Sequence, residues 1–140
     1  MNTRVSFYLL QSSRRSPLQV ACQLAVKAWE KEQPVSIIAG SAGEAAALDK
    51  MLWENSTERF IPHNLARPGK SPFSPIVIGV DDTLATRADV TINLSADPIR
   101  HSGSRILEIV DCSGETVDRG RKKYAHYRQL GYKLEDHKLK

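Results

Sequence analysis

A stripe of side chains near the C-terminus combines two guanidinium groups with an aromatic ring. Its members are Val117, Arg121, Tyr124 and Arg128, spaced by four, three and four residues. This spacing places them on one face of a helix. Two guanidinium groups beside a ring can bind a carboxylate through charge-assisted hydrogen bonds while the ring walls an apolar pocket. In the alternative, Tyr124 and Tyr127 pack inward and the arginines form a solvated cover over them.

Two glycine-containing segments suggest phosphate binding, and neither completes a known motif. Gly40 and Gly43 lie between an expected strand and an expected helix, where a phosphate cradle would form. A dinucleotide fingerprint needs a third glycine and a ribose-binding acid, and this segment has neither. An ordinary turn between strand and helix is therefore favoured. The segment 69–71, Gly-Lys-Ser, matches the end of a P-loop, but the leading glycine is replaced by Asn64. We therefore predict no nucleotide site.

Motifs for nucleophilic or metal catalysis are missing from the sequence. There is no GxSxG or HExxH pattern, and the four histidines lack the spacing of metal ligands. His63 could act as a lone base, but a hydrogen bond that anchors a loop is the favoured interpretation. Cys22 and Cys112 belong to no CxxC pair, so we expect two small buried apolar side chains and no disulfide. The sequence predicts no catalytic residue, no metal and no cofactor.

Strands and helices alternate in the first half of the chain. Residues 5–10 and 35–39 are rich in β-branched and aromatic residues and predict strands. Ser16 and Pro17 begin a helix that should end near Glu32, before Pro34. A second helix is expected over 44–53, and a final helix from 114 or 115 to 130, ending before Gly131. Three further strands are expected over 76–80, 90–94 and 105–110.

This order of elements predicts one α/β domain that spans residues 1–140. Its sheet should be mostly parallel, with right-handed crossovers and helices on both faces. The 140 residues are 41% hydrophobic, which is enough for one core. Residues 54–75 contain several prolines, and their apolar residues recur neither at the spacing of a helix nor at the alternation of a strand. We therefore expect a long loop there. No apolar run is long enough to span a membrane or to serve as a signal peptide, which favours the cytoplasm.

The positive charge of the chain lies at its C-terminal end. Residues 119–140 carry eight basic and two acidic side chains, whereas the first 118 residues have a net charge of −2. A basic stretch on a nearly neutral domain indicates an anionic partner. One alternative is a nucleic-acid-binding module in which this stretch contacts phosphates and Tyr124, Tyr127 and Tyr132 stack on bases. A nucleotide-dependent transferase is a further alternative.

Five segments along the chain resemble the chi subunit family of bacterial DNA polymerase III. They are residues 7–10 (FYLL), 48–53 (LDKMLW), 60–66 (FIPHNLA), 108–111 (EIVD) and 120–132 (GRKKYAHYRQLGY). Their order and approximate spacing match the family over nearly the whole chain. The second and third segments together with the last are specific to that family.

The resemblance implies a Rossmann-like fold without a functional nucleotide site and a non-catalytic role in DNA replication. Chi subunits join the clamp loader through the psi subunit and bind the acidic, phenylalanine-terminated tail of single-stranded DNA-binding protein. A repair helicase is a further candidate partner, and DNA would be reached only indirectly. The implied location is the replisome in the bacterial cytoplasm.

The resemblance also implies roles for individual residues. Arg121 and Tyr124 match positions that the family uses for the tail, with Arg128 and Val117 on the same face. The family often has a lysine directly after this tyrosine, where this chain has Ala125. For the psi subunit, the matching aromatic residues are Trp53 and Phe60, and Pro62 and His63 belong to the same segment. Plain core packing of the two aromatic residues is the alternative.

Overall fold

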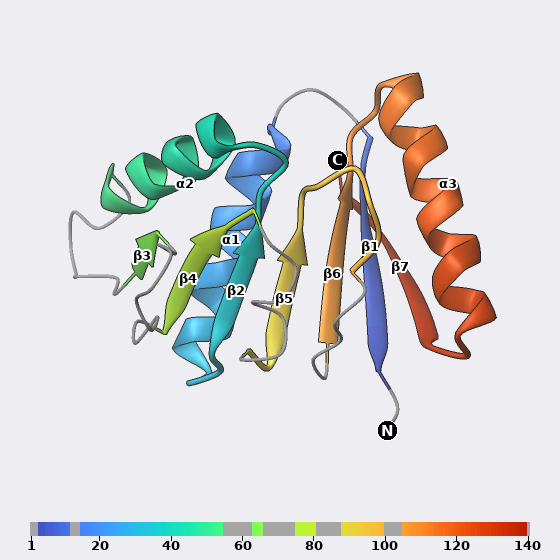
Figure 1. Ribbon diagram of the computed structural model, residues 1–140, viewed down its shortest axis with the longest axis horizontal. Helices are drawn as coiled ribbons and strands as arrows, with labels where there is room; N and C mark the ends of the chain where they lie inside the picture. The colour runs from blue at the N-terminus through green and yellow to red at the C-terminus, as the bar shows by residue number, and fades with distance from the viewer. Residues whose placement is uncertain are drawn as a thin grey trace.

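A computed structural model describes residues 3–11, 15–54, 63–65, 75–80, 88–99 and 105–139. Within these ranges there are seven strands and three helices (Figure 1). The strands are β1 (Arg4–Leu10), β2 (Val35–Ile38), β3 (His63–Leu65), β4 (Ile76–Gly79), β5 (Val90–Asn93), β6 (Arg105–Val110) and β7 (Lys133–Leu139). The helices are α1 (Pro17–Glu30), α2 (Ala42–Glu54) and α3 (Gly114–Gln129).

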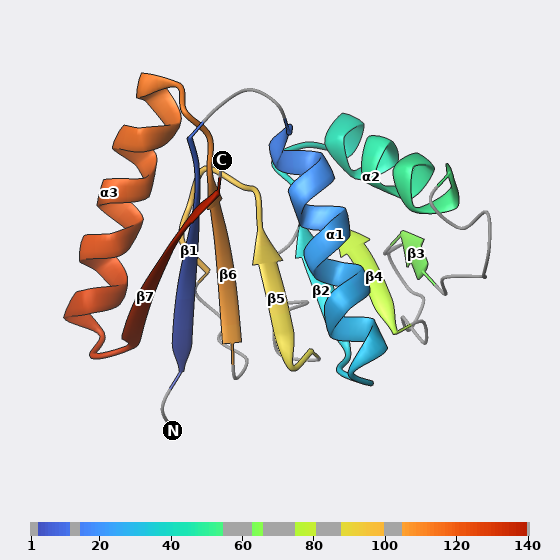
Figure 2. The same ribbon diagram turned by 180° about the vertical axis from the view of Figure 1, so that it is seen from behind.

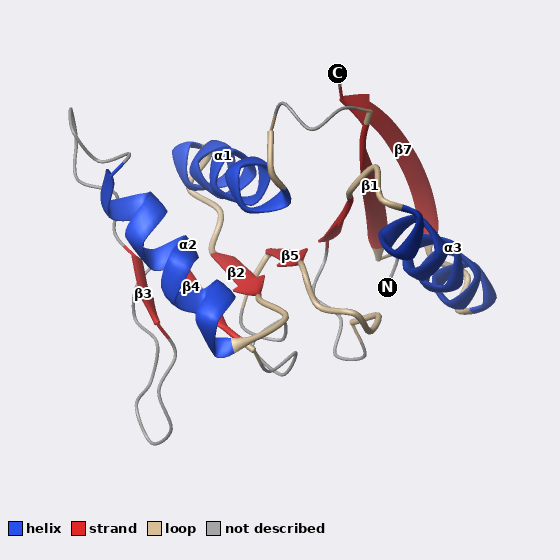
Figure 3. Ribbon diagram, turned by 90° about the horizontal axis from the view of Figure 1, so that it is seen from above, coloured by secondary structure: helices blue, strands red, loops and turns tan. Residues whose placement is uncertain are grey.

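All seven described strands form one parallel sheet in the order β3-β4-β2-β5-β6-β1-β7. Helix α1 lies in front of the sheet when the molecule is seen from behind (Figure 2). Seen from above, α1 and α3 lie on opposite sides of the strands (Figure 3). The predicted α/β class, with a parallel sheet and helices on both faces, is confirmed.

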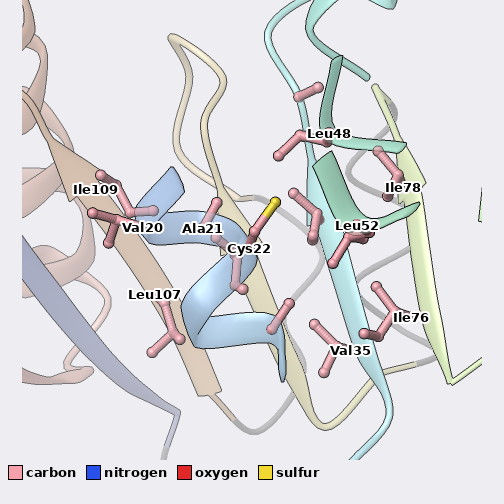
Figure 4. Packing of buried hydrophobic residues seen from close by; sticks show 14 of the residues in the cluster. Val20, Ala21, Cys22, Val35, Leu48, Leu52, Ile76, Ile78, Leu107 and Ile109 are labelled. Atoms are coloured by element: carbon pink, nitrogen blue, oxygen red, sulfur yellow. The ribbon is translucent and has the colours of Figure 1, made fainter. Parts of the chain in front are cut away.

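Apolar side chains of the sheet pack into a hydrophobic core on each of its two faces. On the α1 side, side chains from α1 and α2 pack on the middle strands, as Figure 4 shows for Val20, Leu48, Leu52, Ile76 and Ile109. On the α3 side, a smaller cluster includes Val5, Phe7, Ile106, Val110 and Tyr127. The helices are therefore held by burial of their apolar stripes, which is the main source of helix stability in a folded domain.

Helix α1 begins as the sequence predicts. The Ser16 hydroxyl accepts a hydrogen bond from the Gln19 N–H at 3.1 Å, and the Gln19 side chain accepts one from the Ser16 N–H at 2.9 Å. This reciprocal capping box, followed by Pro17 at the first position, satisfies donors that the helix cannot satisfy itself. The helix ends at Glu30 rather than near Glu32, because Glu32 already has a φ of 60°.

Two strands, the three-residue β3 and the seven-residue β7, were not predicted from the sequence. β3 lies inside the predicted loop 54–75, and its three residues are too few to show an alternating pattern. β7 follows α3 and pairs in parallel with β1, so the C-terminal residues are not simply a basic tail. Its sequence, KLEDHKL, is rich in charge, which is typical of an edge strand, and among the described strands β7 has β1 as its one neighbour.

The chain leaves two neighbouring strands toward opposite faces of the sheet. β1 leads to α1 on one face, whereas the adjacent β6 leads to α3 on the other. In open parallel α/β sheets, ligands bind in the crevice outside the carboxyl ends of two such strands. The topology therefore points to the carboxyl ends of β1 and β6 as a place to look for a binding site.

Candidate functional site

A cavity of about 440 Å³ lies at the carboxyl ends of β1 and β6, under one side of α3. β1 and the residue after it contribute Phe7, Leu9, Leu10 and Gln11, and β6 and the residues after it contribute Val110, Asp111 and Cys112. α3 contributes Val117, Gly120, Arg121 and Tyr124, and β7 contributes Asp136. The cavity thus occupies the crevice that the strand order predicts.

The floor of the cavity is apolar because parallel strands alternate their side chains between the two faces. Phe7 and Leu9 lie on the α3 side of β1, and Val110 lies on the same side of β6. Asp136 is the register partner of Phe7 on β7, so it lies next to that ring at the edge of the sheet. The floor is hydrophobic and one carboxylate borders it.

The wall that α3 provides depends on the close approach of Gly120 to β6. A Cβ atom added at Gly120 would lie 3.0 Å from a methyl carbon of Val110. This distance is tighter than nine in ten real Cβ contacts, so a side chain there would require Val110 or the helix to shift by a few tenths of an ångström. Gly120 therefore sets the distance between α3 and the floor of the cavity.

Tyr124 is packed on one side and open on the other. Its ring centroid lies 5.4 Å from that of Phe7 with an interplanar angle of 49°, and 37% of the residue is exposed. Tyr127, by contrast, is fully buried. The inward-packing alternative therefore holds for Tyr127, whereas the Tyr124 ring lines the cavity and can contact a ligand.

Arg121 lines the cavity and, within the described residues, makes no hydrogen bond or ion pair. Arg119, two positions earlier on the same helix, pairs with Glu115. Arg128 is also exposed and unpaired within the described residues, but it does not line the cavity. The structure thus brings Val117, Arg121 and Tyr124 together at one site and places Arg128 farther along α3, outside that site.

A buried polar cluster fastens α3 to the sheet beneath this site. Glu108 of β6 is fully buried and accepts hydrogen bonds from Lys123 at 2.9 Å, Tyr127 at 2.6 Å and Asn93 at 2.8 Å. The Lys123 ammonium also donates to the Ser95 carbonyl at 2.6 Å. The Tyr127 hydroxyl accepts from the Ile99 N–H at 2.7 Å. Every member of the cluster has partners, as buried polar groups require.

Burial and mutual charge shift the pKa values within the cluster. Burial raises the pKa of Glu108, and the Lys123 ammonium and the three donated hydrogen bonds act in the opposite direction. Burial, followed by the charge of Glu108, raises the pKa of Tyr127. The phenol therefore stays protonated and keeps donating to Glu108. This cluster was not predicted from the sequence, where its one signal is a glutamate inside the apolar strand RILEIV.

Comparison with known proteins agrees with the motifs. A family model for the DNA polymerase III chi subunit matches residues 2–135 of the chain. The chain belongs to the DNA polymerase III chi subunit family. Membership gives it an accessory role in DNA replication.

Three chi subunits align with nearly the whole chain. The chi subunit of Pseudomonas aeruginosa is 36% identical over 140 residues, which covers 98% of this chain and 97% of the relative. That of Haemophilus influenzae is 28% identical and covers 96% of each. That of Escherichia coli is 27% identical and covers 92% of this chain and 93% of the relative.

The second group of chi-like residues is only partly described. Trp53 is 55% exposed at the end of α2, so the core-packing alternative does not apply to it. His63 begins β3, and its side chain is outside the described residues. Phe60 and Pro62 also lie outside the described residues. Their predicted interface role therefore stays a prediction.

A side chain of the protein itself occupies the glycine turn after β2, which consists of residues 40–43. The Glu44 carboxylate accepts a hydrogen bond from the Gly40 N–H at 2.8 Å, and the Ser41 hydroxyl accepts one from the Glu44 N–H at 3.2 Å. A side-chain carboxylate thus occupies the place where a phosphate would bind. The ordinary turn that the sequence analysis favoured is confirmed.

The two cysteines differ from each other. Cys22 is buried in the core, as expected, and its burial raises the pKa of the thiol to about 11. The expectation that Cys112 is buried was wrong: it is exposed at the cavity, because it lies two residues beyond Val110, the last residue of β6. Within the described ranges, His, Cys, Asp and Glu side chains form no group of three that could hold a metal ion. None of the described helices is long and apolar enough to cross a membrane.

Proposed function

We propose that this chi-family chain is a non-catalytic adaptor that binds the acidic, phenylalanine-terminated tail of single-stranded DNA-binding protein. Its second partner is the psi subunit, which links it to the clamp loader. The observation that carries the proposal is Arg121, which has no partner among the described residues and lies at an apolar cavity whose wall includes the half-packed ring of Tyr124.

The cavity matches the chemistry of such a tail. A phenylalanine side chain can rest on the floor formed by Phe7, Leu9 and Val110, against Tyr124. The terminal carboxylate can then accept paired hydrogen bonds from Arg121. The acidic residues that precede it would extend toward Arg128, which shares the helix face of Arg121. Because these charges are exposed, we expect affinity on the order of micromolar that weakens as salt rises.

Few basic side chains of α3 are available to the tail at this site, as positions 123 and 125 show. The lysine that many family members have after the tyrosine is replaced by Ala125, which is exposed. Lys123 cannot substitute for it, since its ammonium is buried against Glu108. Lys122 remains exposed on α3. In this chain the positive charge of the tail site therefore comes from Arg121, with Arg128 and Lys122 outside the cavity.

The position of Trp53 supports an adaptor with two separate surfaces. Helix α2 packs near β3 and β4 at one edge of the sheet, whereas α3 and β7 lie at the other edge (Figure 1). Large exposed aromatic residues commonly dominate protein interfaces. We assign Trp53, with Phe60, Pro62 and His63, to the psi surface, for which a repair helicase would compete. The psi subunit and the tail of single-stranded DNA-binding protein can then be bound at the same time in the bacterial cytoplasm.

The arrangement of the tyrosines argues against direct nucleic-acid binding. Tyr127 is buried under α3, and Tyr132 is half-buried and stacked on it at 6.0 Å. They therefore do not join Tyr124 in an exposed platform for bases. Lys123 and Arg119 form ion pairs with Glu108 and Glu115, respectively, so their charges are already neutralised within the protein.

Titration with a labelled tail peptide tests the proposal. Two matched peptides accompany it, one lacking the terminal phenylalanine and one ending in a carboxamide. We expect saturable binding of the complete tail and at least about tenfold weaker binding of the other two, because each loses an anchoring group. Equal binding of all three, or salt-sensitive binding of oligonucleotides alone, would contradict the proposal.

The psi surface is tested separately. Trp53→Ala should abolish binding of the psi subunit and leave binding of the tail peptide unchanged. Leu130→Ala is a matched control, since Leu130 is similarly exposed, at 51%, but lies at the end of α3. Full psi binding by the Trp53 variant would remove this residue from the interface.

A further inference from the structure

The cavity that Arg121 lines also has a carboxylate on its other wall, and this carboxylate has no partner in the part of the chain that the structure describes. Asp136 of β7 lines the cavity, is exposed, and within the described residues has no hydrogen-bond or ion-pair partner. The other acid at the cavity, Asp111, already accepts a hydrogen bond from the Cys112 N–H at 2.8 Å. Of these two acids, Asp136 is the one whose carboxylate has no partner among the described residues.

A carboxylate at this place is unexpected in a site for an acidic peptide. Two like charges repel strongly where water is partly excluded, so an acidic side chain inside the cavity would be rejected by Asp136. The last residue of a peptide also carries a main-chain N–H, however. An N–H donor directed at an ionised carboxylate forms one of the stronger hydrogen bonds found in proteins.

We propose that Asp136 determines specificity by accepting the main-chain N–H of the ligand's last residue, while Arg121 holds the terminal carboxylate of that residue. This inference rests on the proposed function. The side chain of the same residue lies on the floor formed by Phe7, Leu9 and Val110. The cavity therefore recognises a free C-terminus with an uncharged apolar side chain, and the acidic residues of the tail remain outside, toward Arg128.

The arrangement of the walls supports recognition at three points. Arg121 comes from α3, Asp136 from the edge strand β7, and the apolar floor from β1 and β6 between them. An amino acid carries its carboxylate, its N–H and its side chain on one tetrahedral carbon. Three different groups on three sides can therefore bind the L form at every point, whereas the D form must give up at least one.

The experiment compares two tail peptides by isothermal titration. One is the natural tail, and in the other the last amide is replaced by an ester, which removes the N–H and keeps the carboxylate and the side chain. We expect the wild type to bind the ester about tenfold more weakly. Asp136→Ala should bind the two peptides within about twofold of each other, since its acceptor is gone.

Glu135→Ala is the matched control on the same strand. Glu135 is the register partner of Ser6, points to the opposite face of the sheet and pairs with Arg4. Like the wild type, this variant should bind the ester about tenfold more weakly than it binds the natural tail. A peptide ending in D-phenylalanine should also bind the wild type about tenfold more weakly than the natural tail.

The results separate this inference from the proposed function. An equal loss for the ester in the wild type and in Asp136→Ala would show that Asp136 is not the acceptor and would overturn the inference. Equal binding of both peptides by the wild type would overturn it as well, while Arg121-dependent binding of the tail would leave the function standing. If the wild type binds no tail peptide at all, both fail. Thermal melting of Asp136→Ala checks that the exposed substitution leaves the fold intact.

Discussion

The hydroxyl of Tyr127 donates a 2.6 Å hydrogen bond to the buried carboxylate of Glu108, which joins α3 to the strand whose end forms part of the cavity. Tyr127 lies one turn beyond Tyr124, and Lys123 bonds to the same carboxylate from the position just before Tyr124. The buried cluster therefore fixes the rotation of α3. Because of this rotation, Tyr124 and Arg121 face the cavity.

Glu108→Gln should destabilise the domain by about 3 kcal/mol, because it leaves the buried ammonium of Lys123 without its anion. Urea unfolding followed by circular dichroism measures the loss. The double variant Glu108→Gln/Lys123→Met should recover much of the stability, since no buried charge remains. A loss below about 0.5 kcal/mol in the single variant would mean that the pair is not buried in solution.

Gly120→Ala should weaken tail binding, because the new methyl group would lie 3.0 Å from Val110, and either that floor residue or α3 must shift by a few tenths of an ångström. Gly43→Ala in α2 is the matched control, since its nearest neighbour outside the helix backbone would be the Ser41 hydroxyl at 3.8 Å. That variant should keep its affinity and its stability within about 1 kcal/mol. Equal affinities in both variants would show that the approach of α3 to β6 does not shape the site.

Arg121→Ala should reduce affinity for the tail at least about tenfold, since a charge-assisted hydrogen bond to the terminal carboxylate is lost. Arg119→Ala removes the same charge from the same helix, but its guanidinium is already paired with Glu115, so less than about a twofold change is expected. Fluorescence anisotropy at two salt concentrations compares the variants. Equal losses would mean that only the net charge of α3 matters.

Cys112 should react with a thiol reagent in the native protein, whereas Cys22 should react only after unfolding, because Cys112 is exposed and Cys22 is buried. Mass spectrometry of the alkylated protein counts the modified thiols. Two modified cysteines under native conditions would contradict the described core.

The pKa of Cys22 also predicts a dependence of stability on pH. Burial raises it from 9.0 to about 11, so between these values the unfolded chain releases a proton that the folded chain retains. The free energy of unfolding should therefore fall as pH rises, by up to about 1.4 kcal/mol per pH unit from this group. The slope should be smaller in Cys22→Ala, in which the titrating group is missing. Equal slopes for the two proteins would rule out this contribution.

Local sequence patterns predict most of the fold and only part of the site. The apolar strands and the capped helix at Ser16 are visible in the sequence because burial and capping select residue types at short range. The stripe of Val117, Arg121 and Tyr124 is visible for the same reason. β7 was not predicted because it lies at the edge of the described sheet, where a charged, irregular pattern is allowed.

Contacts between distant segments could not be predicted in this way. Asp136 joins the cavity only because β7 lies in register beside Phe7, and nothing near position 136 indicates this. Glu108 meets Lys123 and Tyr127 only after α3 has packed on the sheet. The position of Arg128 outside the cavity likewise depends on how far along α3 the floor of the cavity extends.

The measurement that tests the central claim most directly is an NMR titration of the 15N-labelled protein with the tail peptide. The claim predicts that the largest shifts of backbone amide signals appear at residues lining the cavity, including Gly120, Arg121, Tyr124 and Asp136, and that Trp53 stays unchanged. Shifts centred on α2 around Trp53, or no shifts at saturating peptide, would contradict a tail site at the carboxyl ends of β1 and β6.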